Sequence, residues 1–151
     1  AKTSKGAARL SGQFREHTAR KTYHAIVIGA PRKKLDTLVH NILKDEHAKK
    51  ANVFDEPAIG RQRAELEYEV IKSVGNNALL RIELKTGRFH QIRAQLSAIG
   101  HPILGDTNYG APEPLKDGSI ALQASILEFE TPTRGERKKI EIEIPESWET
   151  F

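Results

Sequence analysis

Cysteine and methionine are both absent from the 151 residues of the sequence. Without cysteine, the chain has no disulfide framework, no thiolate zinc site and no cysteine nucleophile, which fits a reducing compartment such as the cytoplasm. No apolar run approaches the length of a membrane span, and the first residues lack the apolar segment of a secretory signal. The sequence therefore predicts a cytoplasmic protein that does not associate with a membrane.

Aromatic residues are scarce at 6%, but hydrophobic residues make up 38% of the chain and charged residues 29%. This length and mixture suit a globular fold with a sizeable core, and we expect residues 1–151 to form a single domain. The chain opens on Ala-Lys-Thr-Ser-Lys rather than on methionine. We therefore expect it to be the later part of a longer protein.

Positive charge is concentrated in the first part of the chain. The net charge is +4 and the pI is about 9.4, yet residues 1–63 hold 14 basic and 6 acidic residues, a net of +8. Residues 64–151 hold 10 basic and 14 acidic residues, a net of −4. Such a polarised distribution is typical of a footprint for nucleic acid or another polyanion. The candidate phosphate contacts, most of which would individually be solvated surface, are Lys5, Arg9, Arg15, Arg20, Lys21, Arg32, Lys33, Lys34, Lys49, Lys50, Arg61 and Arg63.

Patterns of apolar residues predict the elements of the first half. A short amphipathic helix near the start follows from spacings of three and four among Ala7, Leu10, Phe14 and His17. Residues 22–29 are rich in β-branched and aromatic residues and predict a buried strand. Residues 35–43 fit both helical spacing and a strand, and the polar residues 44–63 predict an exposed loop.

The second half predicts four strands and a helix. Apolar spacing over residues 89–99 predicts a helix that ends at Gly100, because glycine commonly follows the last turn. The order of elements, with more strands than helices, predicts an α+β fold. The expected strands are residues 64–70 and 78–85, joined by a turn at residues 75–77, and residues 120–129 and 140–144.

A run of cationic and polar residues follows the strand at residues 78–85. Residues 85–93 are Lys-Thr-Gly-Arg-Phe-His-Gln-Ile-Arg, so the predicted helix starts with Arg88, His90, Gln91 and Arg93 around its first turn. Cations at a helix amino terminus oppose the macrodipole, and local helix energetics do not favour two arginines there. Either the arginines pair with surface carboxylates, or one of them holds a buried carboxylate or a phosphate.

This run resembles the Gly-Arg-x-His-Gln-Ile/Leu-Arg signature of the RluA-type pseudouridine synthases. Residues 100–106, Gly-His-Pro-Ile-Leu-Gly-Asp, are similar to the block that follows the signature in that family. Residues 14–16 with 21–25 resemble the segment that carries the family's active-site tyrosine, and residues 64–70 resemble one of its strands. The blocks occur in the family's order, and the resemblance spans the chain from Ala1 to about Pro145.

The resemblance implies a mixed, largely antiparallel sheet flanked by helices, with an RNA-binding cleft across it. It favours a strand for residues 35–43. It also implies an enzyme that isomerises specific uridines of rRNA or tRNA to pseudouridine, with no metal and no organic cofactor. RNA is the expected partner, and we favour a monomer.

The resemblance further implies roles for six residues. Arg93 matches the arginine that pairs with the family's nucleophilic aspartate, and Tyr23 matches the tyrosine that stacks on the target base, so both are predicted to be catalytic. By composition alone, Arg93 would form a helix-surface ion pair and Tyr23 would be a core aromatic residue. The predicted substrate-binding residues, which shape the turn, the RNA-facing edge and an apolar wall, are Arg88, His90, Gln91 and Leu122.

The family's nucleophilic aspartate has no counterpart in the sequence. It belongs to a His-Arg-Leu-Asp-x-x-x-Ser-Gly motif that by register would precede Ala1, and we expect the chain alone to be inactive. Three explanations are open: a fragment of a longer enzyme, a chain recorded without its amino-terminal part, or a relative that keeps only RNA binding. The alternative function is therefore a non-catalytic RNA-binding module on the same fold. The aspartates that do not match the motif are Asp36, Asp45, Asp55, Asp106 and Asp117.

Overall fold

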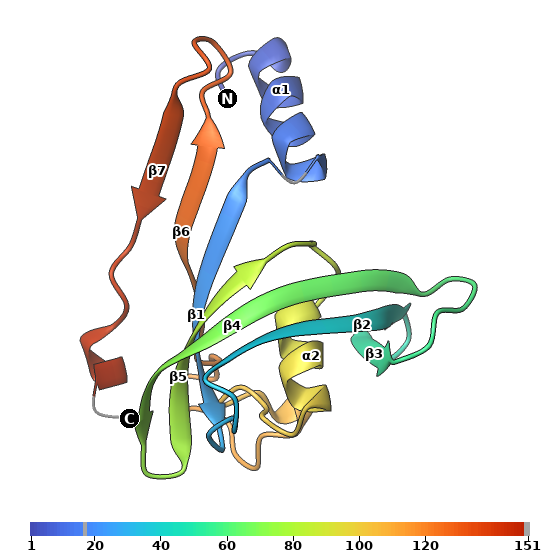
Figure 1. The fold of residues 1–151 in the computed structure, drawn as a ribbon, viewed down its shortest axis with the longest axis vertical. Coiled ribbons are helices and arrows are strands. Elements are labelled where there is room, and N and C mark those ends of the chain that lie inside the picture. The colour runs from blue at the N-terminus through green and yellow to red at the C-terminus, as the bar shows by residue number, and fades with distance from the viewer. Residues whose placement is uncertain (17, 150–151) are drawn as a thin grey trace.

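One antiparallel sheet forms the body of the structure, a computed structural model that describes residues 1–16 and 18–149. Its strands lie in the order β3-β2-β4-β5-β1-β6-β7, and each neighbouring pair within the described residues is antiparallel (Figure 1). The predicted α+β class with a largely antiparallel sheet is confirmed. The strands are β1 (Arg20–Ile28), β2 (Leu35–Asp45), β3 (Lys50–Phe54), β4 (Gln62–Val74), β5 (Asn77–Leu84), β6 (Leu122–Glu130) and β7 (Arg137–Glu141).

The central strands follow the patterns that predicted them. The strands expected at residues 22–29, 64–70 and 78–85 are β1, β4 and β5, and a tight turn joins β4 to β5 where predicted. Strand β2 covers residues 35–43, for which the residues alone left helix and strand open. Its two buried side chains, Leu38 and Ile42, are four positions apart, a spacing that suits one face of a strand as well as a helix.

The exposed loop predicted for residues 44–63 is wrong, because strand β3 lies within it and pairs with β2. The carboxylate of Asp45 accepts the backbone N–H groups of His47 and Ala48 at 3.0 and 2.9 Å, which turns the chain back on itself. A strand at the edge of a sheet needs few buried side chains, and in β3 only Ala51 is fully buried. The polar composition of this segment therefore hid the strand.

Helix α1 (Ser4–Arg15) confirms the helix predicted near the start, and the Thr3 hydroxyl caps it by accepting the Gly6 N–H at 3.1 Å. None of its side chains is fully buried, since the helix lies beside the end of β6 and the start of β7, at the periphery of the sheet (Figure 1). The Gln13 amide holds it there by donating to the Glu130 carbonyl and accepting the Glu130 N–H, both at 2.7 Å. His17, the last residue of the predicted apolar face, lies outside the described residues.

Two other boundaries differ from prediction. Helix α2 (Gln91–Ala98) begins two residues later than expected, because His90 takes a left-handed conformation with φ 49° just before it. Arg88 therefore lies in the preceding loop and not in the helix. The strand expected at residues 140–144 is β7, which pairs earlier, over Arg137–Glu141. The alternation of Ile and Glu continues past the end of the hydrogen-bonded ladder.

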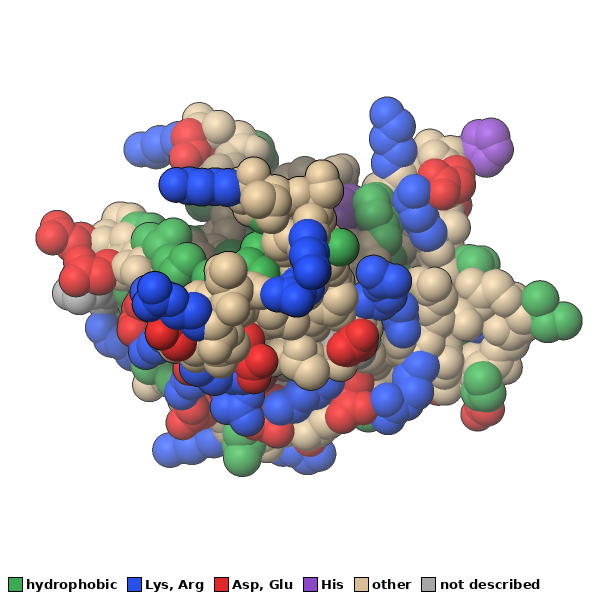
Figure 2. Space-filling model, turned by 90° about the horizontal axis from the view of Figure 1, so that it is seen from above, with side chains coloured by type: hydrophobic (Ala, Val, Ile, Leu, Met, Phe, Trp, Pro, Cys, Tyr) green, Lys and Arg blue, Asp and Glu red, His purple; other side chains and the backbone are tan. Residues whose placement is uncertain are grey.

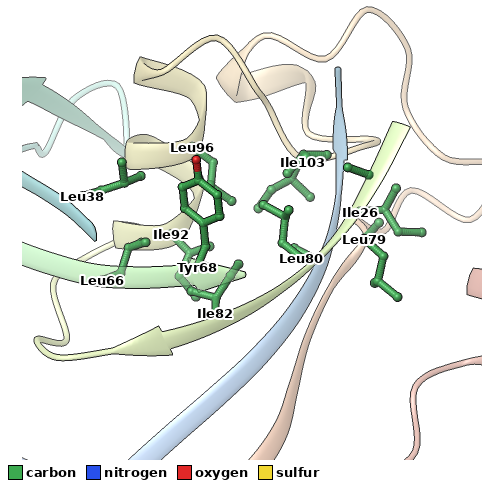
Figure 3. Packing of buried hydrophobic residues seen from close by; sticks show 14 residues of the cluster. Ile26, Leu38, Leu66, Tyr68, Leu79, Leu80, Ile82, Ile92, Leu96 and Ile103 are labelled. Atoms are coloured by element: carbon green, nitrogen blue, oxygen red, sulfur yellow. The ribbon is translucent and has the colours of Figure 1, made fainter. Parts of the chain in front are cut away.

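The core lies between α2 and the face of the sheet formed by β2, β4, β5 and β1 (Figure 3). Leu66, Leu80 and Ile82 from the sheet and Leu96 from α2 are each fully buried. Ile103, in the loop after α2, pairs with Val27 of β1 and closes one side of this core. The packing fixes α2 and the loop after it against the sheet. In the described part of the chain, no helix combines the length and apolar character needed to cross a membrane.

Candidate active site

An open hollow of about 210 Å³ lies where β5 ends and the chain turns into α2. Strands β1 and β6 form one side of it, and the β5–α2 loop and the start of α2 form the other. The six residues that the family resemblance singled out all line this hollow, although they are as much as 99 positions apart in the sequence. The complete lining is Tyr23, Leu84, Arg88, His90, Gln91, Ile92, Arg93 and Leu122.

Tyr23 and Leu122 supply an aromatic and an aliphatic surface from neighbouring strands. The β1–β6 register shifts between Thr22 and Tyr23, so Tyr23 pairs with Ala124, and Leu122 pairs with Ala25. Both side chains are partly exposed. Burial raises the pKa of the Tyr23 phenol, which keeps the hydroxyl protonated at neutral pH. The pair can therefore hold a flat, largely apolar group without offering it a charge.

Arg93 holds a buried carboxylate, one of the two alternatives that its sequence position left open. Its Nε donates to one oxygen of Asp106 and its Nη2 to the other, each at 2.7 Å. The Asp106 side chain is 1% exposed and that of Arg93 18%. The hydrogen bonds to Asp106 raise the pKa of Arg93 further above its already high value. The guanidinium is thus a fixed cation at the edge of the hollow.

His90 connects this pair to Tyr109. Its Nε2 lies 3.1 Å from Nη1 of Arg93, and its Nδ1 lies 3.1 Å from the hydroxyl of Tyr109. Because a guanidinium can only donate, we assign Nε2 as the acceptor and put the ring proton on Nδ1. Burial lowers the pKa of His90, and the charge of Arg93 lowers it further, against a smaller opposite effect of Asp106. The imidazole is therefore neutral near pH 7.

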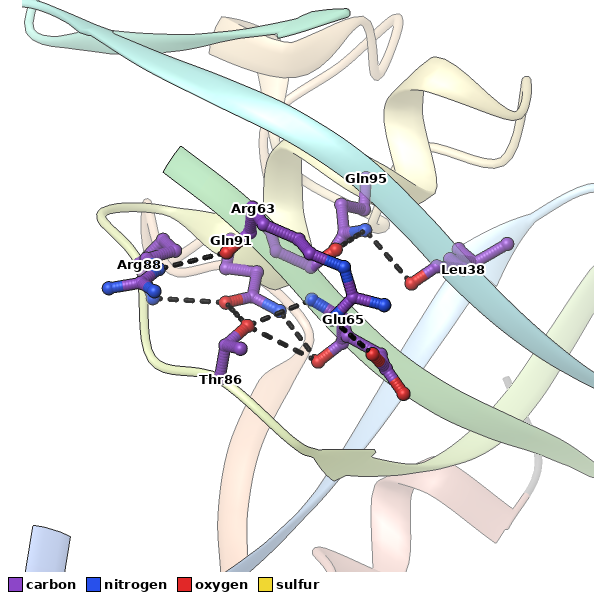
Figure 4. A network of polar contacts seen from close by, with 8 residues as sticks. Leu38, Arg63, Glu65, Thr86, Arg88, Gln91 and Gln95 are labelled. Carbon is purple, nitrogen blue, oxygen red and sulfur yellow. Dashed lines mark hydrogen bonds and ion pairs between the residues drawn. The ribbon is translucent and has the colours of Figure 1, made fainter. Parts of the chain in front are cut away.

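Gln91 shapes the loop rather than facing the hollow with its amide (Figure 4). Its Oε1 accepts the Thr86 hydroxyl at 2.8 Å and the Arg88 N–H at 3.0 Å, and its Nε2 donates to the Glu65 carbonyl at 3.0 Å. The side chain is buried, with all these groups paired. Arg88 is held in turn, since its Nε donates to the Arg63 carbonyl at 3.0 Å. These bonds tie the loop to β4 and fix the rim of the hollow.

Asp106 and Tyr109 are parts of this site that were not predicted from the sequence. Asp106 ends the Gly-His-Pro-Ile-Leu-Gly-Asp block, so the resemblance contained a signal for it, but no pattern paired it with Arg93. Tyr109 lies in a short 3₁₀ turn, Thr107–Tyr109, and its hydroxyl accepts the Ala51 N–H at 2.7 Å. The residue therefore links the site to strand β3, which the sequence did not predict.

Charge is less segregated in space than along the sequence. Several basic residues of the first half pair with neighbouring carboxylates, as Lys33 does with Asp36 at 3.1 Å and Arg63 with Glu65 at 2.6 Å. On the face seen in Figure 2, Lys and Arg side chains are interspersed with Asp and Glu. Among the residues that the structure describes, no three His, Asp or Glu side chains gather closely enough to hold a metal ion.

Comparisons with known proteins agree on one family. A family model described as RNA pseudouridylate synthase matches residues 1–98. An uncharacterized RNA pseudouridine synthase of Chlorobaculum parvum is 35% identical over 93% of this chain and 48% of its own length. tRNA pseudouridine synthase C of Salmonella typhimurium is 32% identical over 97% of this chain and 62% of its own length.

Solved structures share the fold. Human RNA pseudouridylate synthase domain containing 4 superposes with a TM-score of 0.78 and 23% identity, over 97% of this chain and 66% of that one. Human RNA pseudouridylate synthase domain containing 1 gives a TM-score of 0.77 at 24% identity, over 95% of this chain and 62% of that one.

The chain spans about half the length of the Chlorobaculum relative and about three fifths of the Salmonella one. With its family model, its relatives and its fold in agreement, the chain belongs to the RNA pseudouridylate synthase family.

Proposed function

We propose that this chain forms the uridine-binding part of an RNA pseudouridine synthase that acts on specific uridines of rRNA or tRNA. In this reaction the bond between N1 of uracil and C1′ of the ribose breaks, the base rotates, and C5 bonds to C1′ in its place. The proton that C5 loses is balanced by the proton that N1 gains. The observation that carries the proposal is that all six residues singled out by the family resemblance line one hollow.

The hollow suits a base that has left its stack. An RNA base must be extruded before an enzyme can reach its glycosidic bond, and an aromatic surface offsets part of the lost stacking. Tyr23 supplies that surface, and Leu122 supplies an apolar wall beside it. In the proposed complex the uracil ring lies against Tyr23, and its ribose faces Arg93.

Arg93 has the properties needed to keep a nucleophilic carboxylate ionised. A cation beside a partly desolvated carboxylate lowers the carboxylate's pKa and so preserves the charged form that attacks. The carboxylate that Arg93 already holds is not available for this role, since Asp106 is 1% exposed and both of its oxygens accept from Arg93. No Asp or Glu is among the described residues that line the hollow. We propose that a segment outside residues 1–151 supplies the nucleophilic aspartate.

Release of tritium tests this function directly, because the reaction removes the hydrogen from C5 of the target uridine. The complete protein is incubated with rRNA and tRNA carrying tritiated C5, and we expect release from one of them. Arg93→Ala should abolish release while RNA affinity stays close to that of the wild type. A complete protein that binds RNA but releases no tritium would overturn the proposal and favour a non-catalytic RNA-binding module.

A further inference from the structure

The loop that carries Asp106 is fixed at several points. Ile103 pairs with Val27, and the Leu104 N–H donates to the Ile26 carbonyl at 2.8 Å, which joins the loop to β1. The Asp106 carbonyl accepts the N–H groups of Tyr109 and Ala111, both at 3.0 Å. The carboxylate of Asp106 therefore has a defined position before it meets Arg93.

Burial of the Arg93–Asp106 ion pair costs free energy, and core packing does not require a charged pair at this position. Burying two opposite charges removes their hydration, and an apolar pair of similar volume often stabilises a core at least as well. Asp106 is buried away from the hollow, whereas Arg93 reaches its edge. Any effect of Asp106 on a bound RNA must therefore pass through the guanidinium.

The donors of Arg93 can be counted. A guanidinium has five N–H groups. Two of them go to Asp106 and one to Nε2 of His90. Within the described residues this leaves one N–H on Nη1 and one on Nη2, the two nitrogens at the tip of the side chain. Because Asp106 holds one edge of the guanidinium, the two remaining N–H groups on its other side keep a constant direction.

We propose that Asp106 is a positioning residue, which holds Arg93 so that its two remaining N–H groups are directed to the nucleophilic carboxylate. This inference rests on the proposed function. It also assigns an electrostatic effect to Asp106, because its negative charge weakens the field of Arg93 at the nucleophile. The two oriented N–H groups of the guanidinium still favour the ionised nucleophile, which is bound less tightly than it would be by an unpaired cation.

The test measures tritium release by the complete protein and its Asp106→Asn variant over a range of pH. Loss of orientation should lower kcat about a hundredfold, the effect of a displacement of about 1 Å, and leave KM for RNA unchanged. Loss of the negative charge should also lower the pKa of the nucleophile and move the acidic limb of the pH profile to lower pH. Asp106→Glu, which keeps the charge but displaces it, should lower kcat without moving that limb.

Ile103→Ala is the matched control, because it removes a fully buried side chain from the same loop and leaves the backbone pairing of this residue with Val27 in place. It should lower the melting temperature and keep both kcat and the pH profile. The NMR signal of the Arg93 Nε–H, protected from exchange in the wild type and in Ile103→Ala, should exchange faster in Asp106→Asn, because an amide has one acceptor oxygen where the carboxylate has two. An active wild type with an unimpaired Asp106→Asn variant, or an Nε–H in that variant as well protected as in the wild type, overturns the positioning role alone. A wild type that releases no tritium overturns the proposed function instead.

Discussion

The imidazole of His90 lies against the guanidinium of Arg93, with Nε2 3.1 Å from Nη1. A proton on Nε2 would face a permanent cation, and burial disfavours the imidazolium as well, so the pKa of His90 is lowered. The stability that depends on neutral His90 is therefore complete above the unfolded-state pKa, about 6.5. It is lost as the pH falls below that value toward the folded-state pKa.

We accordingly expect the free energy of unfolding to decrease between about pH 6.5 and pH 5. His24 and His40 also have lowered pKa values, mainly through burial, and add to this decrease. His90→Gln should reduce the slope without abolishing it. Urea unfolding at several pH values measures the slope, and His47→Gln, at an exposed position in the β2–β3 turn, is the control. Identical slopes for wild type and His90→Gln would contradict the prediction.

A second prediction concerns Gln91. Replacement by leucine leaves the Arg88 N–H without the partner that Gln91 gives it, whereas the Glu65 carbonyl keeps the N–H groups of Lys85 and Thr86, and the Thr86 hydroxyl keeps its bonds to Glu65. A polar group left unpaired costs about 1–3 kcal/mol, and we expect Gln91→Leu to destabilise the protein by about that amount. Gln123→Leu is the matched control, because Gln123 makes one exposed bond, to the Glu143 carbonyl at 2.9 Å. Its effect should stay within about 0.5 kcal/mol.

The sequence predicted the parts of the fold in which the alternation of apolar and polar residues matches the alternation of buried and exposed positions. Strand β4 buries alternate residues, β5 does the same except that Leu79 is buried as well, and Leu66, Leu80 and Ile82 have no exposed surface. Strand β3 was missed because an edge strand carries little of this signal. The start of α2 was misplaced because the left-handed conformation of His90 depends on contacts with Tyr109 and Arg93, which are formed only in the folded chain.

Only part of the candidate site could be predicted from the sequence. Family resemblance named six of the eight residues that line the hollow, which come from separate elements and which no local pattern could bring together. It named neither Asp106 nor Tyr109. The pairing of Arg93 with Asp106 spans 13 positions and the turn at the end of α2. Charge and spacing indicated that an arginine here could hold a buried carboxylate, but only tertiary structure identifies which one.

Substitutions at Tyr23 separate the contribution of its aromatic face from that of its hydroxyl. Tyr23→Phe keeps the aromatic face, so RNA affinity should be unchanged, and any loss of tritium release then reports on the hydroxyl. Tyr23→Ala removes the face, and affinity should fall by the value of one stacked base, about 1–3 kcal/mol. Gel-shift titration of the complete protein with its RNA measures the affinity of both variants. Equal affinities for Tyr23→Ala and wild type would contradict a stacking role.

A polar groove next to the hollow is the expected path of the RNA backbone. Arg20, Lys21 and Lys85 line this groove, which shares Leu84 with the hollow. Removing one phosphate contact should reduce the slope of log affinity against log salt by about 0.7, the value for single strands. We expect this for Lys21→Ala. Lys85→Ala should change the slope less, because the Lys85 ammonium lies 3.5 Å from the Glu83 carboxylate, and Lys33→Ala, whose ammonium is paired with Asp36, should leave the slope unchanged. An unchanged slope in Lys21→Ala would contradict this path.

The last prediction concerns the glycine that precedes Asp106. Gly105 has φ +85°, and an added Cβ would lie 2.7 Å from Cγ of Leu115 and 2.9 Å from the Ser119 carbonyl oxygen. Gly118 has φ +72° with nothing within 4 Å of such a Cβ. Both alanine variants bear the left-handed strain of about 1–2 kcal/mol, whereas only Gly105→Ala adds the crowding penalty of about 1–3 kcal/mol. Chemical unfolding should therefore show Gly105→Ala to be the less stable variant, and equal stabilities would mean that the loop relaxes around the new methyl group.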